Sequence, residues 1–179
     1  MSAQKREFIN NEILTSSIVA GLGRGYSVYS NKKVLEKNRN ELKRYLRGKL
    51  VVYSKKYSKK ITSEDHFKSI EKFANGVTKD YKNILNDGYF MIGRAQKLLN
   101  LYLKFQWVLG WIPEPPHCPL DYRIIKKLDS NISWTKMNEI NEYQFLVEKA
   151  EREAKKQNLS LAKWELQLWN SLTFNQGKF

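Results

Sequence analysis

Lysine and arginine side chains are concentrated near the amino terminus of this 179-residue chain. The first sixty residues carry 15 of them against four Glu and no Asp, which gives a local charge of +11 out of a formal +14. Charge of one sign at this density repels itself unless a polyanion neutralises it, and a row of phosphates is its natural counterpart. The cations that we expect to form a phosphate-binding surface are Arg24, Lys32, Lys33, Lys37, Arg39, Lys43, Arg44, Arg47, Lys55 and Lys56.

Tyrosines accompany these cations. Tyr26 and Tyr29 precede the basic run, and Tyr45, Tyr53 and Tyr57 interleave with it. Aromatic rings among cations can stack the bases of a single nucleic-acid strand. Their spacing fits equally well a helix whose tyrosines face the core and whose lysines face water. Both alternatives stay open at the level of sequence.

A second cluster that could do chemistry lies in Pro113–Asp121, which reads PEPPHCPLD and holds all four prolines. His117 is a candidate general acid–base, and Asp121 could orient it or bind a metal. The alternative is a rigid proline corner in which His117 is a satisfied structural residue. Zinc sites usually need four Cys or His ligands, and this chain has one Cys and two His. We therefore predict no metal site and no cofactor.

A glycine-rich stretch, Gly21-Leu-Gly-Arg-Gly25, offers backbone amides beside Arg24. A phosphate-binding P-loop needs four residues between its glycines followed by Lys-Ser or Lys-Thr, and neither is present. The stretch therefore predicts a connector between helices.

The elements that position these residues are predicted to be helical nearly throughout. We expect a short helix over 3–18, and then a long basic helix that Asn31 caps and that runs to about Tyr57. Another helix follows Thr62. The apolar segment 89–111 is interrupted by Arg94 and two lysines, which argues against a membrane span and for the central helix of a bundle. Its polar residues fall on one narrow stripe that we expect to be wetted: Gly93, Gln96, Lys97, Asn100 and Lys104.

Beyond the prolines, three more helices are expected. Pro119 suits the first residue of one, with Cys118 as its cap and Asp121 in its first turn. Ser133 or Thr135 opens a longer one, and Ser160 caps the last. On that last helix Trp164 and Trp169 are five residues apart, so one could be buried and the other exposed as an anchor for a second subunit. The simpler alternative, which we favour, is that both belong to the core.

The length and composition indicate one folded domain over 1–179, an all-α bundle of six to eight helices with a basic region over about 1–60 and a helical core over about 61–179. Hydrophobic residues make up 41% of the chain, which excludes a disordered protein. The single Cys118 excludes an intramolecular disulfide. With no transmembrane segment or signal peptide evident, we expect a cytoplasmic protein.

The function that these features favour is binding of DNA or RNA through the phosphate backbone. One alternative is an interaction module, an inhibitor or regulator, that binds an acidic protein partner. Another is an enzyme acting on nucleic acid with a His117/Asp121 site, and a homodimer is compatible with each. The sequence leaves open DNA against RNA, single against double strand, and whether His66 and His117 meet in space.

Overall fold

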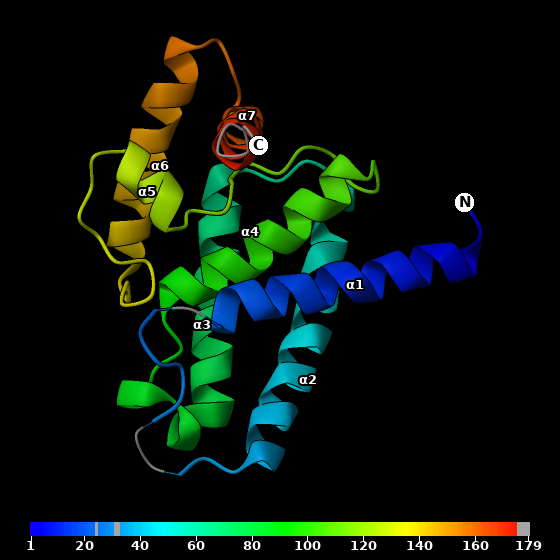
Figure 1. The fold of residues 1–179 in the computed structure, drawn as a ribbon, viewed down its shortest axis with the longest axis vertical. Coiled ribbons are helices and arrows are strands. Elements are labelled where there is room, and N and C mark those ends of the chain that lie inside the picture. Colours follow the sequence, from blue (N-terminus) through cyan, green and yellow to red (C-terminus); the bar gives the residue numbers. More distant parts are fainter. Residues whose placement is uncertain (24, 31–32, 175–179) are drawn as a thin grey trace.

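The computed structural model describes residues 1–23, 25–30 and 33–174, and within them the chain folds into seven α-helices (Figure 1). The one β-type pairing in this part of the chain is a single bridge between Tyr29 and Leu85. The all-α prediction is therefore confirmed. The helices are α1 (Ala3–Leu22), α2 (Glu36–Ser54), α3 (Ser63–Tyr81), α4 (Ile92–Val108), α5 (Tyr122–Lys127), α6 (Ile140–Lys156) and α7 (Leu161–Phe174), with 3₁₀ turns η1 (Lys55–Ser58), η2 (Lys82–Ile84) and η3 (Asn86–Gly88).

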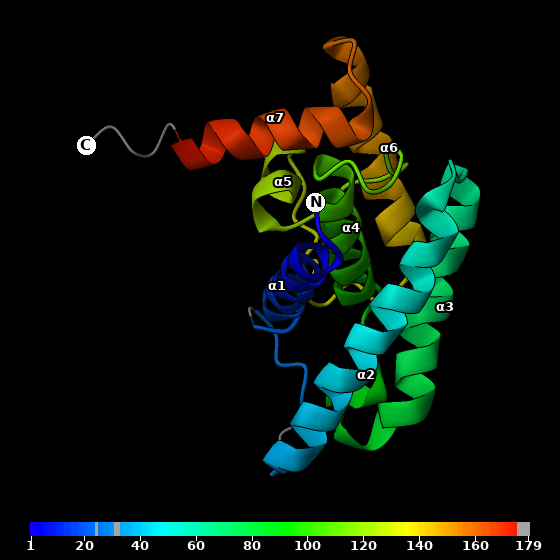
Figure 2. The ribbon, with the colours of Figure 1, turned by 90° about the vertical axis from the view of Figure 1, so that its right-hand side faces the viewer.

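Helix α4 is the centre of the bundle, as its apolar sequence predicts. It packs against α1, α2, α3 and α6. Helices α2 and α3 run side by side in opposite directions, joined by η1, and α1 crosses them (Figure 1). Helices α5, α6 and α7 lie together toward the top of both views. Helix α7 extends away from the rest of the bundle (Figure 2). None of the helices in the described residues is both long and apolar enough to cross a lipid bilayer.

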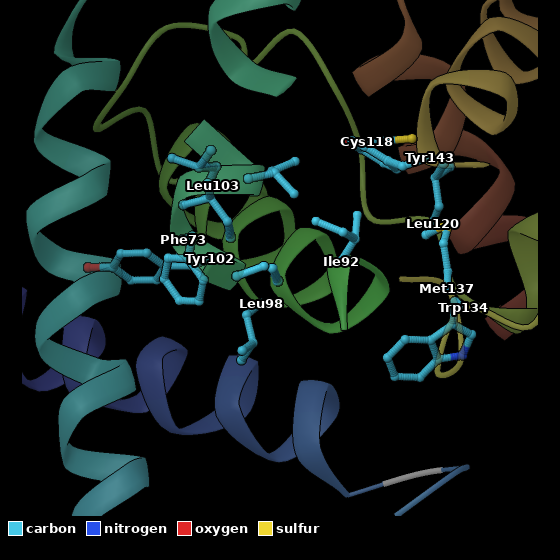
Figure 3. Packing of buried hydrophobic residues seen from close by; sticks show 14 of the residues in the cluster. Phe73, Ile92, Leu98, Tyr102, Leu103, Cys118, Leu120, Trp134, Met137 and Tyr143 are labelled. Atoms are coloured by element: carbon cyan, nitrogen blue, oxygen red, sulfur yellow. The ribbon is translucent and has the colours of Figure 1, made fainter. Parts of the chain in front are cut away.

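The core is formed by the buried faces of the outer helices and by α4, most of whose residues are buried. On α2, Leu42, Leu46 and Leu50 recur every four residues and are fully buried, so the remaining faces of this helix are left to polar side chains. Phe73 of α3 and Leu98 of α4 lie in the same cluster (Figure 3).

Two predicted helix boundaries in the basic region are corrected by the structure. Helix α1 continues through Gly21 to Leu22, and Gly23 is its C-cap. The long basic helix begins at Glu36 because Leu35, its N-cap, has an extended backbone (φ −62°, ψ 144°). The predicted cap, Asn31, lies outside the described residues.

The helix expected at Pro119 begins instead at Tyr122. Asp121 is its N-cap, and its carboxylate accepts the backbone N–H groups of Arg123 and Ile124. Residues up to Leu120 stay extended because the amide of Gln96 binds both the N–H (3.1 Å) and the C=O (2.6 Å) of Leu120. The prediction of Cys118 as a cap was therefore wrong.

The helix expected from Ser133 or Thr135 begins at Ile140, where Glu139 and Glu142 form a capping box. The stretch before it lies across the start of α4. The N–H of Gly93 donates to the carbonyl of Met137 (2.9 Å), and a Cβ on Gly93 would come within 1.7 Å of the Trp134 carbonyl oxygen. Glycine at position 93 is what allows this stretch to reach α4.

Candidate functional site

Helix α2 and the turn η1 present most of the predicted phosphate-binding cations to solvent. Because the leucines of α2 face the core, its Lys and Arg side chains lie on the outer face and its flanks. The exposed ones on α2 and η1 are Lys37, Arg39, Lys43, Arg44, Lys55 and Lys56, and Lys33 is exposed in the connector just before α2. Two other predicted members, Arg24 and Lys32, lie outside the described residues.

These cations have no carboxylate partners. Residues 33–60 contain eleven Lys and Arg but only two acids, Glu36 and Glu41. The five ion pairs among the described residues all lie elsewhere, and none involves a cation of this stretch. The outer surface of α2 and η1, which we call the basic face, therefore carries an excess of positive charge that is not taken up in ion pairs.

Arg47 differs from the other cations because it is committed to the fold. It is half-buried, and its guanidinium donates to the hydroxyl of Thr15 (2.9 Å) and to the carbonyl of Asn11 (3.3 Å), both in α1. It holds α1 against α2. The other two arginines of α2, Arg39 and Arg44, are exposed.

The tyrosines of the basic run turn toward α3. Tyr57 is buried. The ring of Tyr53 meets Phe73 edge-on with centroids 5.3 Å apart, and Tyr45 meets Tyr81 in the same way at 5.0 Å. The hydroxyl of Tyr45 also donates to the carboxylate of Asp80. These rings are part of the α2–α3 interface.

The two histidines of the chain do meet. His66, on α3, and His117, in the proline-rich segment, are both fully buried, and their ring centroids are 4.5 Å apart. Burial lowers the pKa of His66 to about 4. Burial, and next the proximity of His66, lowers the pKa of His117 well below its usual value. Both rings are therefore neutral at pH 7.

The hydrogen bonds of His66 define its tautomer. Asn100 Nδ2 lies 2.9 Å from the carbonyl oxygen of Cys118, which can only accept, so Asn100 Oδ1 faces His66. His66 Nε2 then donates to that oxygen (2.7 Å), and its Nδ1 accepts from the hydroxyl of Tyr57 (2.5 Å). Both nitrogens of the neutral ring are satisfied.

The same amide orients His117. Asn100 Nδ2 lies 2.9 Å from the hydroxyl of Tyr143, which therefore donates its own proton to Nδ1 of His117 (2.9 Å). This leaves the proton of His117 on Nε2, where it is donated to the hydroxyl of Ser63 (2.6 Å) at the first residue of α3. In this tautomer Nε2 of His117 is a donor, so the ring cannot take the proton of Ser63.

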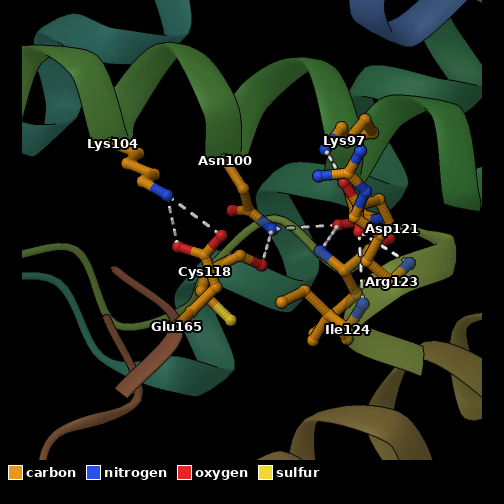
Figure 4. A network of polar contacts seen from close by, with 10 residues as sticks. Lys97, Asn100, Lys104, Cys118, Asp121, Arg123, Ile124 and Glu165 are labelled. Carbon is orange, nitrogen blue, oxygen red and sulfur yellow. Dashed lines mark hydrogen bonds and ion pairs between the residues drawn. The ribbon is translucent and has the colours of Figure 1, made fainter. Parts of the chain in front are cut away.

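Asp121, the predicted partner of His117, is engaged elsewhere. Its carboxylate forms an ion pair with Lys97 (2.8 Å) and caps α5 (Figure 4). Burial raises its pKa, but the Lys97 ammonium and the bonds to α5 outweigh this and keep the pKa below its usual value. The structure thus brings His117 together with Ser63 and Tyr143, and it pairs Asp121 with α4.

A second ion pair on α4 joins it to α7. Lys104 and Glu165 are both buried, with both carboxylate oxygens within 3.0 Å of the ammonium. Together with Lys97, this places the polar stripe of α4 inside the protein, whereas we expected it to be wetted. The stripe is buried because the extended segment ending at Asp121 and helix α7 supply partners for it (Figure 4).

No metal centre is evident in the described part of the chain, where no group of three His, Cys, Asp or Glu could hold an ion. The thiol of Cys118 is buried, which raises its pKa. Sequence reasoning missed Asn100, Tyr143 and Ser63 as partners of the histidines. The available signal was Asn100 itself, an amide in the middle of the most apolar helix.

Comparisons of this chain with protein-family models, with curated proteins and with solved structures found no match.

Proposed function

We propose that this protein binds nucleic acid through the phosphate backbone and that the basic face of α2 and η1 is the contact surface. The observation that supports this is the row of exposed cations without carboxylate partners. Each lysine or arginine that neutralises a phosphate releases a condensed counterion, so an unpaired row gains more from a polyanion than a salt-bridged one does.

The spacing along α2 also suits a linear polyanion. Lys37, Arg44 and Lys55 are separated by seven and eleven residues, close to two and three helical turns, so they lie on the same outer line. At a rise of 1.5 Å per residue this line is about 27 Å long. It can follow several successive phosphates without bending the helix.

The test is a charge-reversal triple variant, Lys37→Glu, Arg44→Glu and Lys55→Glu, and a matched control with the same net charge. The control reverses Lys127, Arg152 and Lys155, which are exposed on α5 and α6, away from α2 in Figures 1 and 2. Arg47 is left intact because its bonds to α1 would confuse loss of binding with loss of structure.

Binding is measured by fluorescence anisotropy with DNA and RNA oligonucleotides over a series of salt concentrations. We expect the α2 variant to bind more weakly at every salt concentration, and the slope of log affinity against log salt to fall by about one per residue reversed. The control variant should keep most of the wild-type affinity and slope. Equal losses in the two variants would refute the basic face as the binding surface.

A further inference from the structure

Four partly exposed tyrosines in or just before the basic run have a cation lying over the ring. These tyrosines are the residues that the sequence offers as stacking platforms for bases. The pairs, with the distance from the cation to the ring centroid, are Tyr26 with Lys136 (5.1 Å), Tyr29 with Arg39 (4.9 Å), Tyr45 with Lys49 (5.0 Å) and Tyr53 with Lys56 (5.0 Å).

Three of these rings also have a second contact within the protein. The edge-on contacts to α3 fix Tyr45 and Tyr53, as described above. The hydroxyl of Tyr26 donates to the carboxylate of Asp87 (2.9 Å). A base could stack on the cation's side of such a ring only by displacing that cation.

From this arrangement we infer that the ligand of the basic face is a double helix, contacted through its phosphates alone, and that the tyrosines are positioning residues for the cations. This inference rests on the proposed function. Proteins that bind single strands without sequence preference combine a basic groove with open aromatic faces on which successive bases stack. Here the basic groups are present, but the rings of Tyr29, Tyr45 and Tyr53 each already carry a cation of the protein on one face.

A cation on a ring is also better prepared to bind a phosphate. A free lysine or arginine loses rotamer freedom when it docks, which weakens binding. The attraction between a cation and the ring quadrupole holds the side chain before the ligand arrives. The structure thus gives the tyrosines a role in affinity that involves no contact with a base.

The experiment compares one oligonucleotide sequence in two forms, as a duplex and as its single strand, in DNA and in RNA, at low salt. The proteins are the wild type, Tyr53→Leu and Tyr53→Phe, each checked for retained helicity by circular dichroism. The Phe variant keeps the ring beneath Lys56 and its contact with Phe73, so it is the matched control.

We expect the wild type to bind the duplex more tightly than the single strand. Tyr53→Leu should weaken both forms by the same factor, about two- to fivefold, as for loss of an exposed cation–π contact, and Tyr53→Phe should bind like the wild type. Tighter binding of the single strand would overturn the inference. So would a Tyr53→Leu loss confined to the single strand, which for a stacked base is about 5- to 150-fold.

The outcomes also separate the two proposals. Preference for the single strand would overturn the duplex assignment and leave nucleic-acid binding standing. No binding of either form would overturn both, and tight binding to an acidic protein in its place would identify the basic face as a protein-docking surface.

Discussion

Because of the buried histidine pair, we expect the stability of the fold to fall when the pH is lowered. His66 and His117 are the two histidines of the chain, and both are neutral and fully buried when it is folded. Between pH 7 and pH 5 no other side-chain type ordinarily titrates, so histidine should dominate any change in stability there. Folding lowers the pKa of each ring, so the unfolded chain binds protons more readily than the folded one. The stabilisation is therefore complete above about pH 6.5 and is lost as the pH falls toward 4.

The magnitude follows from the pKa of His66, about 4 in the folded protein against an ordinary value of about 6.5. One pKa unit corresponds to about 1.4 kcal/mol, so His66 alone removes about 2 kcal/mol from the free energy of unfolding at pH 5 and about 3.4 kcal/mol below pH 4. His117, whose pKa is also well below its usual value, adds a loss in the same direction. Against a total stability of about 5–15 kcal/mol, the combined loss is large.

The assay is urea unfolding followed by tryptophan fluorescence at constant ionic strength from pH 7 to pH 5. Between pH 6 and pH 5 the free energy of unfolding should fall with a slope approaching two protons, about 2.7 kcal/mol per pH unit. In His66→Gln, which keeps a donor and an acceptor for Asn100 and Tyr57, the slope should approach one proton. A wild-type free energy of unfolding that stays constant from pH 7 to pH 5 would refute the buried neutral pair, whether or not the variant folds.

Two further predictions concern packing around α4. Gly93→Ala should destabilise the protein by about 3 kcal/mol or more in urea denaturation, because its Cβ meets the backbone of Trp134, whereas Gly48→Ala, on an open helix surface, should stabilise it by up to about 1 kcal/mol. Glu165→Gln, which leaves the buried Lys104 ammonium without its carboxylate, should cost about 3–5 kcal/mol, and the double variant Lys104→Met, Glu165→Leu should recover most of it. Equal stabilities of the single and double variants would contradict the ion-pair interpretation.

The fold class could be predicted because it depends on periodicity, which is local. The four-residue recurrence of Leu42, Leu46 and Leu50 is visible in the sequence, and these side chains are buried as it predicts. The long apolar run that becomes α4 is likewise visible in the sequence, and most of its side chains are buried. For α7 the sequence left two alternatives for Trp164 and Trp169, and the structure has Trp164 buried and Trp169 39% exposed.

Helix starts were less predictable because distant residues decide them. Pro119 is a favourable first residue of a helix, and Cys118 could have preceded it as a cap. What prevents this is the side-chain amide of Gln96, more than twenty residues away, which binds both backbone groups of Leu120 and keeps the segment extended. Asp121, next in the chain, then caps α5. The residues around Pro119 alone therefore do not reveal that the helix starts later.

The polar stripe of α4 shows why a buried network is hard to recognise from sequence. Polar residues along one edge of an apolar helix usually face water, and that rule led to the wrong expectation. Asn100 can be buried because a carbonyl, a hydroxyl and an imidazole meet it from Cys118, Tyr143 and His66. Those partners come from three separate parts of the chain, so the stripe becomes a core feature only after the chain has folded.

His117 of the proline-rich segment is buried under the same condition, that its polar atoms have partners. Burying two imidazoles without a carboxylate beside them is tolerable only while every polar atom has a partner and both rings stay neutral. His117 meets these conditions by donating to Ser63 and accepting from Tyr143, so the prolines hold it where it completes the core. A general acid–base must reach its substrate and exchange a proton with it, and a ring with 0% exposure does neither without opening the segment. On α2 and η1, by contrast, Lys37, Arg44 and Lys55 face solvent without carboxylate partners.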